Sequence, residues 1–464
     1  MTPTLFAFFV CAGGLLASGS RALYLQMVFC LFGAAAAIAL PALGGATITP
    51  AVMFLPFLLA RALGERGLGG CLRQVSFPDA GFWLLLLVVW GAISAYFLPR
   101  MFAGQLQVFT IDRDAMHSGA LLRLSPLYPV SGNLTQSGYA LGAVCAFVAM
   151  RALFLRKGRL DDFRDAVLLL AGLNCLAGLV NLAEFYLGLP SVLEYVRTGG
   201  YAIVESYELA GLMRLSGTFT EASGFAGFTL PLLAFSATLW LNNVRAGYSG
   251  TVALILLVLL LMSTSSTAYV GLTTYLFCLT VVLVWRGVVH GKVPRMRPLI
   301  FGGTLGLMAI SIVILYDPGV VTRVAEFFEV TVVNKLQSSS GIERSSWNEQ
   351  AWSNFLNTYG AGVGLGSARA STFPLVLLSN VGAFGTLLFL VFLSRVFLRI
   401  GPNRALPTAA VPRAARQAVL AALISASVSA GVFDLGVAFY AFAAAATVTP
   451  PKPEPLLEEA RGYA

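Results

Sequence analysis

Apolar runs long enough to cross a lipid bilayer recur from one end of this chain to the other. Hydrophobic residues make up 58% of its 464 residues, charged residues make up only 11%, and the mean hydropathy is +0.81. A soluble globular domain has about a quarter of its residues charged, so this composition excludes one. A run long enough to span a bilayer can form an α-helix, which satisfies its own backbone hydrogen bonds there. The sequence therefore predicts an all-α, polytopic membrane protein.

The runs predict about 12 to 13 transmembrane helices. The first run, Leu5–Ala17, has no Lys or Arg before it, so we expect a retained helix rather than a cleaved signal peptide. The last run, Ala418–Val448, is too long for one helix, and we expect it to break around Gly431–Gly436. The other predicted spans are Ala22–Ala42, Ile48–Leu59, Gly81–Leu98, Tyr139–Phe154, Ala166–Leu187, Gly224–Leu241, Val252–Met262, Ala268–Trp285, Leu299–Leu315 and Phe373–Leu393.

Lysine and arginine are distributed unevenly over the loops that these spans create. Of the 30 basic residues, 18 fall in loops that alternating spans place on one face, at 61–73, 151–164, 245, 286–297 and 395–416. Short loops rich in Lys and Arg stay in the cytoplasm, so this face is predicted to be cytoplasmic. Topology thus explains most of the net charge of +9, and nucleic acid is not expected as a partner.

The opposite face is predicted to carry three larger loops, at 99–138, 190–222 and 317–371. Positive charge is disfavoured on that face, so its basic residues need another reason to exist. We expect residues 1–449 to form a single membrane domain with its chemistry at the outer membrane–water boundary, and residues 450–464 to form a disordered tail. The basic residues in the three loops are Arg100, Arg113, Arg123, Arg197, Arg214, Arg323, Lys335, Arg344 and Arg369.

The loop before residue 224 combines a fixed cation with carboxylates: Glu208, Arg214 and Glu221. A guanidinium fork suits the paired oxygens of a diphosphate, so Arg214 is a candidate for binding an anionic, lipid-linked substrate; the alternative is an anchor at lipid phosphates. Glu221 is a candidate acid–base group. Its alternative role is to favour the start of the next helix, which Thr220 would cap.

The last large loop contains a second set of candidates. Arg344 and Asn348 share one face of a predicted helix, and Trp347 either stacks on a sugar or anchors the helix in the membrane interface. Gly364 and Gly366 either present backbone N–H groups to a phosphate or permit a tight turn. The charged loop residues predicted to bind substrate are Glu208, Arg323, Lys335 and Arg369.

Polar residues also fall inside the apolar runs. Asn174, Asn181 and Glu184 share one side of a predicted helix, and such groups usually pair across helices or line a cavity. We expect the asparagines to connect helices, and Glu184 and Asp434 to need a cation. The chain has only two histidines and no Cys-x-x-Cys spacing, so neither a metal nor another cofactor is predicted.

Three segments of the chain form a recognisable series. They are Arg214-x-x-Gly217-Thr-Phe-x-Glu221-x-Ser223, then Ser265-Ser-Thr-Ala-Tyr-Val-Gly-Leu272, then Arg344 with Gly362-Val-Gly-Leu-Gly-Ser367 and Asn380-x-Gly382. In this order they resemble the O-antigen polymerase and O-antigen ligase superfamily of bacterial envelope enzymes. The resemblance covers roughly residues 190 to 385.

This resemblance implies an inverting, metal-independent glycosyltransferase of the GT-C type in the bacterial inner membrane. Its active site would face the periplasm, and it would pass a glycan from undecaprenyl diphosphate to a hydroxyl acceptor. Arg214 and Arg344 match the places of family arginines that contact the diphosphate. The resemblance also implies membrane lipids, and chain-length regulator or flippase proteins, as partners.

Two departures from the superfamily favour a polymerase over a ligase. Ligases carry a His-Asn pair where this chain has Ser371 and Thr372, and an Arg often stands where it has Ser266. The histidine base of the ligases is therefore absent. We expect polymerisation of O-antigen, capsule or exopolysaccharide repeat units, with Glu221 as the general base. The alternatives are a ligase that transfers the glycan to lipid A core, and a transporter or flippase for a lipid-linked sugar.

Overall fold

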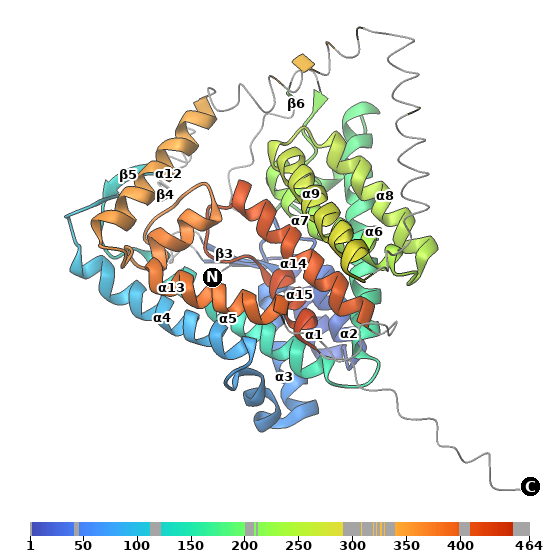
Figure 1. The fold of residues 1–464 in the computed structure, drawn as a ribbon, viewed down its shortest axis with the longest axis horizontal. Helices are drawn as coiled ribbons and strands as arrows, with labels where there is room; N and C mark the ends of the chain where they lie inside the picture. Colours follow the sequence, from blue (N-terminus) through green and yellow to red (C-terminus); the bar gives the residue numbers. More distant parts are fainter. Residues whose placement is uncertain are drawn as a thin grey trace, which may run out of the picture.

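The computed structural model describes residues 2–40, 46–111, 122–199, 208–209, 212–290, 339–398 and 409–448, with a few single positions between 308 and 329. This part of the chain is mostly helical (Figure 1). The α-helices are α1 (Leu5–Leu16), α2 (Ser20–Phe29), α3 (Pro50–Leu72), α4 (Ala80–Met101), α5 (Ser131–Phe154), α6 (Arg159–Tyr186), α7 (Ala222–Leu241), α8 (Ala246–Met262), α9 (Ser266–His290), α12 (Ser339–Asn357), α13 (Phe373–Leu398), α14 (Ala410–Val428) and α15 (Val437–Thr447).

In the part of the chain that the structure describes, seven short strands, which the sequence did not predict, form three small antiparallel sheets. The strands are β1 (Thr2–Pro3), β2 (Ile38–Leu40), β3 (Ala46–Ile48), β4 (Gln107–Ile111), β5 (Leu122–Pro126), β6 (Glu208–Leu209) and β7 (Leu212–Met213). Strands β1, β2 and β3 form one sheet, β4 pairs with β5, and β6 pairs with β7. Short 3₁₀ helices lie at Arg73–Val75 and Val192–Tyr195.

Six of the described helices, α4, α5, α6, α7, α9 and α13, are long and apolar enough to cross a membrane. Helices α1, α8 and α15 are shorter apolar helices. The prediction of a mostly helical membrane protein is therefore confirmed, with fewer full-length spans in the described residues than the sequence predicted. The predicted span at 299–315 and the tail at 450–464 lie outside the described residues.

The second predicted span, Ala22–Ala42, is wrong in its second half. Helix α2 ends at Phe29, and β2 begins at Ile38. Between them, the Ala34 N–H donates to the Thr218 carbonyl at 3.3 Å and the Ala36 N–H donates to Thr198 Oγ1 at 3.2 Å. An apolar segment buried under loops has the same composition as a membrane helix, so periodicity alone could not separate the two.

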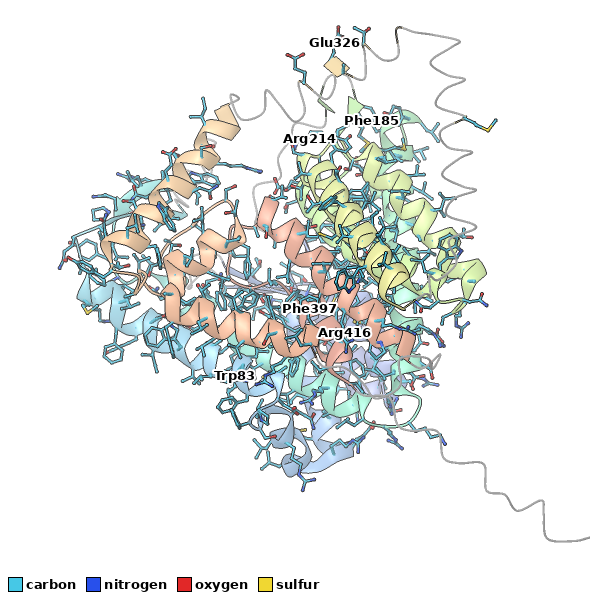
Figure 2. All side chains as sticks on the ribbon, viewed as in Figure 1. Trp83, Phe185, Arg214, Glu326, Phe397 and Arg416 are labelled. Atoms are coloured by element: carbon cyan, nitrogen blue, oxygen red, sulfur yellow. The ribbon has the colours of Figure 1, made fainter. Side chains whose placement is uncertain are left out.

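Helices α7 and α14 run antiparallel. Thr238 and Asn242 at the end of α7 lie beside Arg413 and Gln417 at the start of α14, and α14 packs closely on both α7 and α9 (Figure 1). Figure 2 accordingly shows Arg214, just before α7, and Arg416, in the first turns of α14, at opposite ends of this helix group. We call the Arg214 end the outer end and the Arg416 end the inner end.

Several of the basic loops gather at the inner end, as the predicted alternation of spans requires. Glu65 pairs with Arg156 at 2.9 Å and with Arg159 at 3.0 Å. Arg245 pairs with Asp165 at 2.8 Å, which ties the start of α8 to α6. These contacts join three segments that the sequence placed on one face, although the structure extends α3 and α6 into two of the predicted loops.

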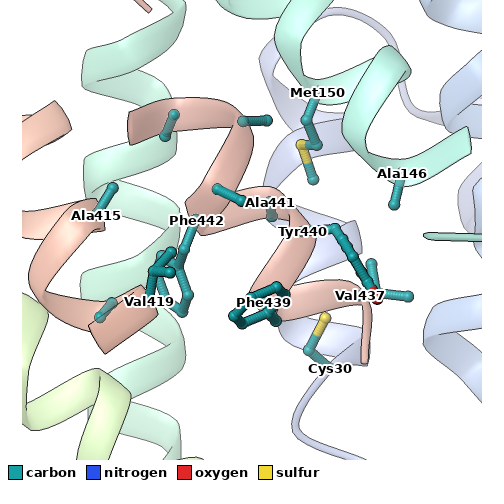
Figure 3. Close-up of a cluster of buried hydrophobic side chains, with 14 of the residues drawn as sticks. Cys30, Ala146, Met150, Ala415, Val419, Val437, Phe439, Tyr440, Ala441 and Phe442 are labelled. Carbon is teal, nitrogen blue, oxygen red and sulfur yellow. The ribbon is translucent and has the colours of Figure 1, made fainter. Parts of the chain in front are cut away.

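The last apolar run breaks where the sequence predicted. Helix α14 ends at Val428, and α15 begins at Val437. Helix α15 is buried along almost its whole length and is rich in alanine, which lets α5 and α14 approach it closely. Figure 3 shows Phe442 of α15 beside Val419 of α14 in this core. The loop 429–436 between the two helices returns to the outer end, beside the residues described next.

Candidate functional site

The Arg214 segment and the serine–threonine segment 263–267 meet at the outer end. Strand β7 pairs with β6, so that Glu208 is opposite Met213. The Thr264 hydroxyl donates to the Met213 carbonyl at 3.1 Å, and Ser263, Thr264 and Ser265 are all buried. Arg214 follows Met213 directly and is half-buried (Figure 2). The first two segments of the sequence series therefore lie together in space.

Two buried side chains hold the backbone that follows Arg214. Asn181 Oδ1 of α6 accepts hydrogen bonds from the Ser216 N–H at 3.1 Å and the Gly217 N–H at 3.0 Å. The Arg197 guanidinium donates to the Gly217 carbonyl through Nε at 3.0 Å and to Ser216 Oγ at 2.9 Å. Gly217 has a φ of +54°, which suits glycine. The loop between Arg214 and Glu221 is thus fixed from both sides.

Glu221 directly precedes α7, and the alternative in which Thr220 caps this helix is wrong. The helix begins at Ala222 with Glu221 at its N-cap position, and no side-chain oxygen there accepts a helix N–H. The Glu221 carboxylate instead accepts the Ser223 hydroxyl. Glu221 is half-buried, and a carboxylate at a helix N-terminus is favoured by the helix dipole. Its side chain is therefore not used for capping.

The polar residues of α6 have separate roles. Asn174 donates to Thr229 Oγ1 of α7 at 3.0 Å, so it connects two helices as expected. Glu184 accepts the Leu193 N–H at 3.0 Å and the Asn181 amide at 3.3 Å. Among the described ion pairs none involves Glu184, and its expected cation partner is replaced by these N–H donors.

The glycine-rich loop of the third segment folds back on α13. The Gly364 N–H donates to the Asn380 carbonyl at 3.0 Å, and the Gly366 N–H donates to Asn380 Oδ1 at 2.9 Å. Asn133 Nδ2 of α5 donates to the Leu365 carbonyl at 2.8 Å. Both glycine N–H groups are therefore used inside the protein. This arrangement favours the tight turn over the phosphate cradle that the spacing also allowed.

Replacing Gly366 by alanine is expected to destabilise the fold. Gly366 has a φ of +83°, and a Cβ there would lie 2.3 Å from the Gly132 carbonyl oxygen. The left-handed backbone alone costs about 1–2 kcal/mol for an L-residue, and the clash adds to it. We expect the midpoint of thermal unfolding in detergent to fall clearly. Gly227→Ala in α7, where no atom lies within 4 Å of the added Cβ, is the control and should stay near wild type.

Helix α12, which carries Arg344, lies on the β4–β5 hairpin and α13. Trp347 packs against Phe109 with ring centroids 6.4 Å apart, and Asn348 Oδ1 accepts the Ser371 N–H at 2.8 Å. Arg344 is half-buried one helical turn before Asn348, as predicted, and makes no ion pair with any described residue. The hydrogen bond of Asn348 and the ring contact of Trp347 thus account for the positions of these two side chains.

The loop 429–436 connects the two parts of the outer end. The Arg369 guanidinium donates to the Gly431 carbonyl at 3.2 Å, and the Ala430 N–H donates to the Ser371 carbonyl at 3.2 Å. The same loop continues from α14, whose neighbour is α7. It therefore lies between the Arg369 loop on one side and the start of α7 on the other. The Arg369 guanidinium therefore forms a hydrogen bond within the protein.

Asp434, in this connecting loop, was not among the predicted site residues. Its Oδ1 accepts the Gly436 N–H at 3.1 Å, and it is half-buried. Burial raises the pKa of the Asp434 carboxyl to about 6, and the Gly436 N–H opposes this shift. A carboxylate with such a pKa suits proton transfer near neutral pH. The signal for it in the sequence was an aspartate inside an apolar run.

The predicted site residues that the structure describes lie on two different elements of the outer end. Arg214 and Glu221 belong to one fixed loop, next to the segment 263–267, whereas Arg344 lies on α12 beside the β4–β5 hairpin. Arg323 and Lys335 lie outside the described residues, as does the side chain of Glu208. No group of His, Cys, Asp and Glu in the described residues forms a metal-binding cluster. No protein-family model and no curated protein matches this chain.

Proposed function

We propose that this protein is an inverting glycosyltransferase that polymerises oligosaccharide repeat units carried on undecaprenyl diphosphate. The observation that carries the proposal is the fixed loop from Arg214 to Glu221. It holds a guanidinium and a carboxylate at one end of a membrane helix group, where a lipid-linked donor would present its diphosphate. Arg344 on α12 is the second cation in the proposal, and its role is to bind the diphosphate.

In the proposed reaction, a hydroxyl oxygen of the acceptor sugar attacks the anomeric carbon of the donor. The bond from that carbon to the diphosphate oxygen breaks, and the diphosphate leaves with the electron pair. Arg214 and Arg344 stabilise the charge that develops on it. Glu221 accepts the proton of the attacking hydroxyl. Acceptor and leaving group lie on opposite faces of the anomeric carbon, so the configuration inverts.

The identity of residue 371 favours a polymerase over a ligase. This residue stands where the ligases carry a histidine, and its backbone is tied to Asn348 and Ala430. A serine hydroxyl there provides no base near neutral pH. The proposed location is the bacterial inner membrane with the outer end facing the periplasm, and the proposed partners are membrane lipids and chain-length regulator or flippase proteins.

The deciding experiment uses the purified protein and an undecaprenyl-diphosphate-linked repeat unit. Growth of longer lipid-linked glycans would support the polymerase. Transfer to lipid A core would instead identify a ligase. Translocation across vesicles without any change in glycan length would identify a flippase and overturn the proposal. Heat-denatured protein is the control for spontaneous transfer.

The proposed orientation predicts which residues a membrane-impermeant maleimide reaches in intact cells. Tyr195 is 83% exposed near the outer end, and the Arg156 side chain is 60% exposed at the inner end. In a variant without the six native cysteines, we expect Tyr195→Cys to be labelled and Arg156→Cys to be labelled only after lysis. The reverse pattern would place the candidate site in the cytoplasm.

A further inference from the structure

The last part of α3 forms a short segment of its own, residues 68–79, which we call the inner segment. Gly67 has a φ of +68°, which suits glycine, and it interrupts the helical backbone of α3. Helical residues resume at Leu68 and continue into the 3₁₀ helix Arg73–Val75. Helix α4, which is long enough to span a membrane, begins directly afterwards at Ala80. Figure 1 shows the end of α3 on the side of the molecule opposite β6.

One side of the inner segment packs on the protein and the other side points outward. Cys71 and Gln74 are buried, and the Gln74 carbonyl accepts a hydrogen bond from Arg151 Nη1 of α5 at 3.2 Å. Leu68 is 67% exposed and Leu72 is 57% exposed. These two leucines are four residues apart, so they share one face of the helix. The segment therefore presents large apolar side chains away from the protein.

Aromatic side chains continue this apolar surface towards α4. Phe77 is 67% exposed, and its ring centroid lies 5.5 Å from that of Phe82 and 6.1 Å from that of Trp83. Figure 2 shows Trp83 on the side of the molecule away from Arg214. Tryptophan is enriched where a membrane meets water. Because the surface is contiguous and directly precedes a spanning helix, the lipid of the membrane boundary is suited to cover it.

The charge that accompanies this apolar surface is positive. Arg66 precedes the two exposed leucines and Arg73 follows them, and both arginines are exposed. The two carboxylates nearby are half-buried and face the protein. Glu65 pairs with the two arginines of α5 and α6 described above, and Asp79 pairs with Arg151 at 2.6 Å. The outward-facing charge is therefore complementary to an anionic membrane surface.

We propose that the inner segment lies in the membrane interface and binds anionic phospholipids. Leu68, Leu72 and Phe77 insert among the acyl chains, and Arg66 and Arg73 contact the lipid phosphates. Amphipathic segments with leucine and aromatic residues beside basic ones bind this boundary through both kinds of contact. The surface is separate from the candidate site at the outer end, and its role does not depend on the glycosyltransferase activity.

The first test measures how deep the segment lies in bilayers of phosphatidylcholine and phosphatidylglycerol. The full chain without its native cysteines carries a nitroxide label on a single cysteine, and collisions with oxygen or with a water-soluble nickel complex are compared. We expect labels at Leu68→Cys and Leu72→Cys to favour oxygen. Val89→Cys, exposed in the middle of α4, is the lipid control, and Arg156→Cys, with a side chain 60% exposed, is the water control. Two positions are labelled so that the result stands if one variant does not fold.

The second test measures which lipid the segment prefers. A fluorescent label at Leu72→Cys is quenched by brominated phosphatidylglycerol or by brominated phosphatidylcholine at the same mole fraction. We expect phosphatidylglycerol to quench more strongly, and Arg73→Gln to lower this preference about fivefold, as expected for one basic residue at the membrane surface. Arg395→Gln removes the same charge from an exposed position of α13, so it is the matched control and should stay within about twofold.

Nickel accessibility at Leu68 and Leu72 equal to that at Arg156 would overturn the insertion of the segment into the membrane. Low accessibility to both reagents would show that protein covers the segment, and would overturn the assignment to lipid. Equal quenching by the two brominated lipids, or equal losses of preference in the Arg73 and Arg395 variants, would overturn the binding of anionic lipid by these arginines.

Discussion

Arg214→Lys is expected to lower the rate of glycan chain extension by about two to three orders of magnitude, although the positive charge is kept. A lysine ammonium is a point charge and cannot form the paired hydrogen bonds that a guanidinium makes with two diphosphate oxygens. The loss of one such contact in the transition state corresponds to about 2–4 kcal/mol. The measurement is the initial rate at which lipid-linked glycans lengthen in the purified system.

The loop around Arg214 makes this substitution a clean test of function. The backbone at Ser216 and Gly217 is held by Asn181 and Arg197, and neither contact involves the Arg214 side chain. The thermal unfolding midpoint of the variant is measured as well, and a loss of activity without a fall in this midpoint assigns the effect to function. Arg123→Lys, at an exposed position of β5, is the control and should retain wild-type activity. Normal polymer length and yield from the Arg214 variant would remove this residue from the site.

The sequence predicted those parts of the fold that composition alone determines. Long apolar runs required helices, and the glycines at 431 and 436 marked the break between α14 and α15. Composition could not reveal that residues 30–40 fold over the outer end as loop and strand, because their neighbours there come from distant segments, including Thr198 and Thr218. A buried loop and a membrane helix are equally apolar.

The charged residues of the candidate site could be predicted from the sequence. The residues whose hydrogen bonds hold the site in place could not. Arg214 and Glu221 stood out because cations are disfavoured in outer loops and carboxylates are rare in this chain. The supports depend on contacts across the sequence, such as Asn181 to Gly217 and Asn133 to Leu365. For the same reason, the glycine run fitted both a phosphate cradle and a turn until the Asn380 contacts were known.

Glu221→Gln is expected to lower chain extension by about 100-fold or more while the protein still folds. Glutamine keeps the size of the side chain and can still accept the Ser223 hydroxyl, but it cannot accept a proton from the attacking sugar. Because the Glu221 side chain makes no cap hydrogen bond to the helix, the free energy of unfolding should change by about 1 kcal/mol or less. Full activity in this variant would exclude Glu221 as the base.

Asp434→Asn and His117→Ala, tested in the same assay, identify the base if it is not Glu221. His117 lies outside the described residues, and of the two histidines in the sequence it is the one in a predicted outer loop. Asp434 makes a distinct prediction, because burial raises the pKa of its carboxyl to about 6. Below that pH the group is protonated and cannot accept a proton, so the rate would fall about tenfold per pH unit as the pH decreases. We expect Asp434→Asn to retain most activity, and both variants to be far more active than Glu221→Gln. A large loss in Asp434→Asn, together with an acid limb near pH 6 in the wild type, would move the general base from the start of α7 to the loop between α14 and α15.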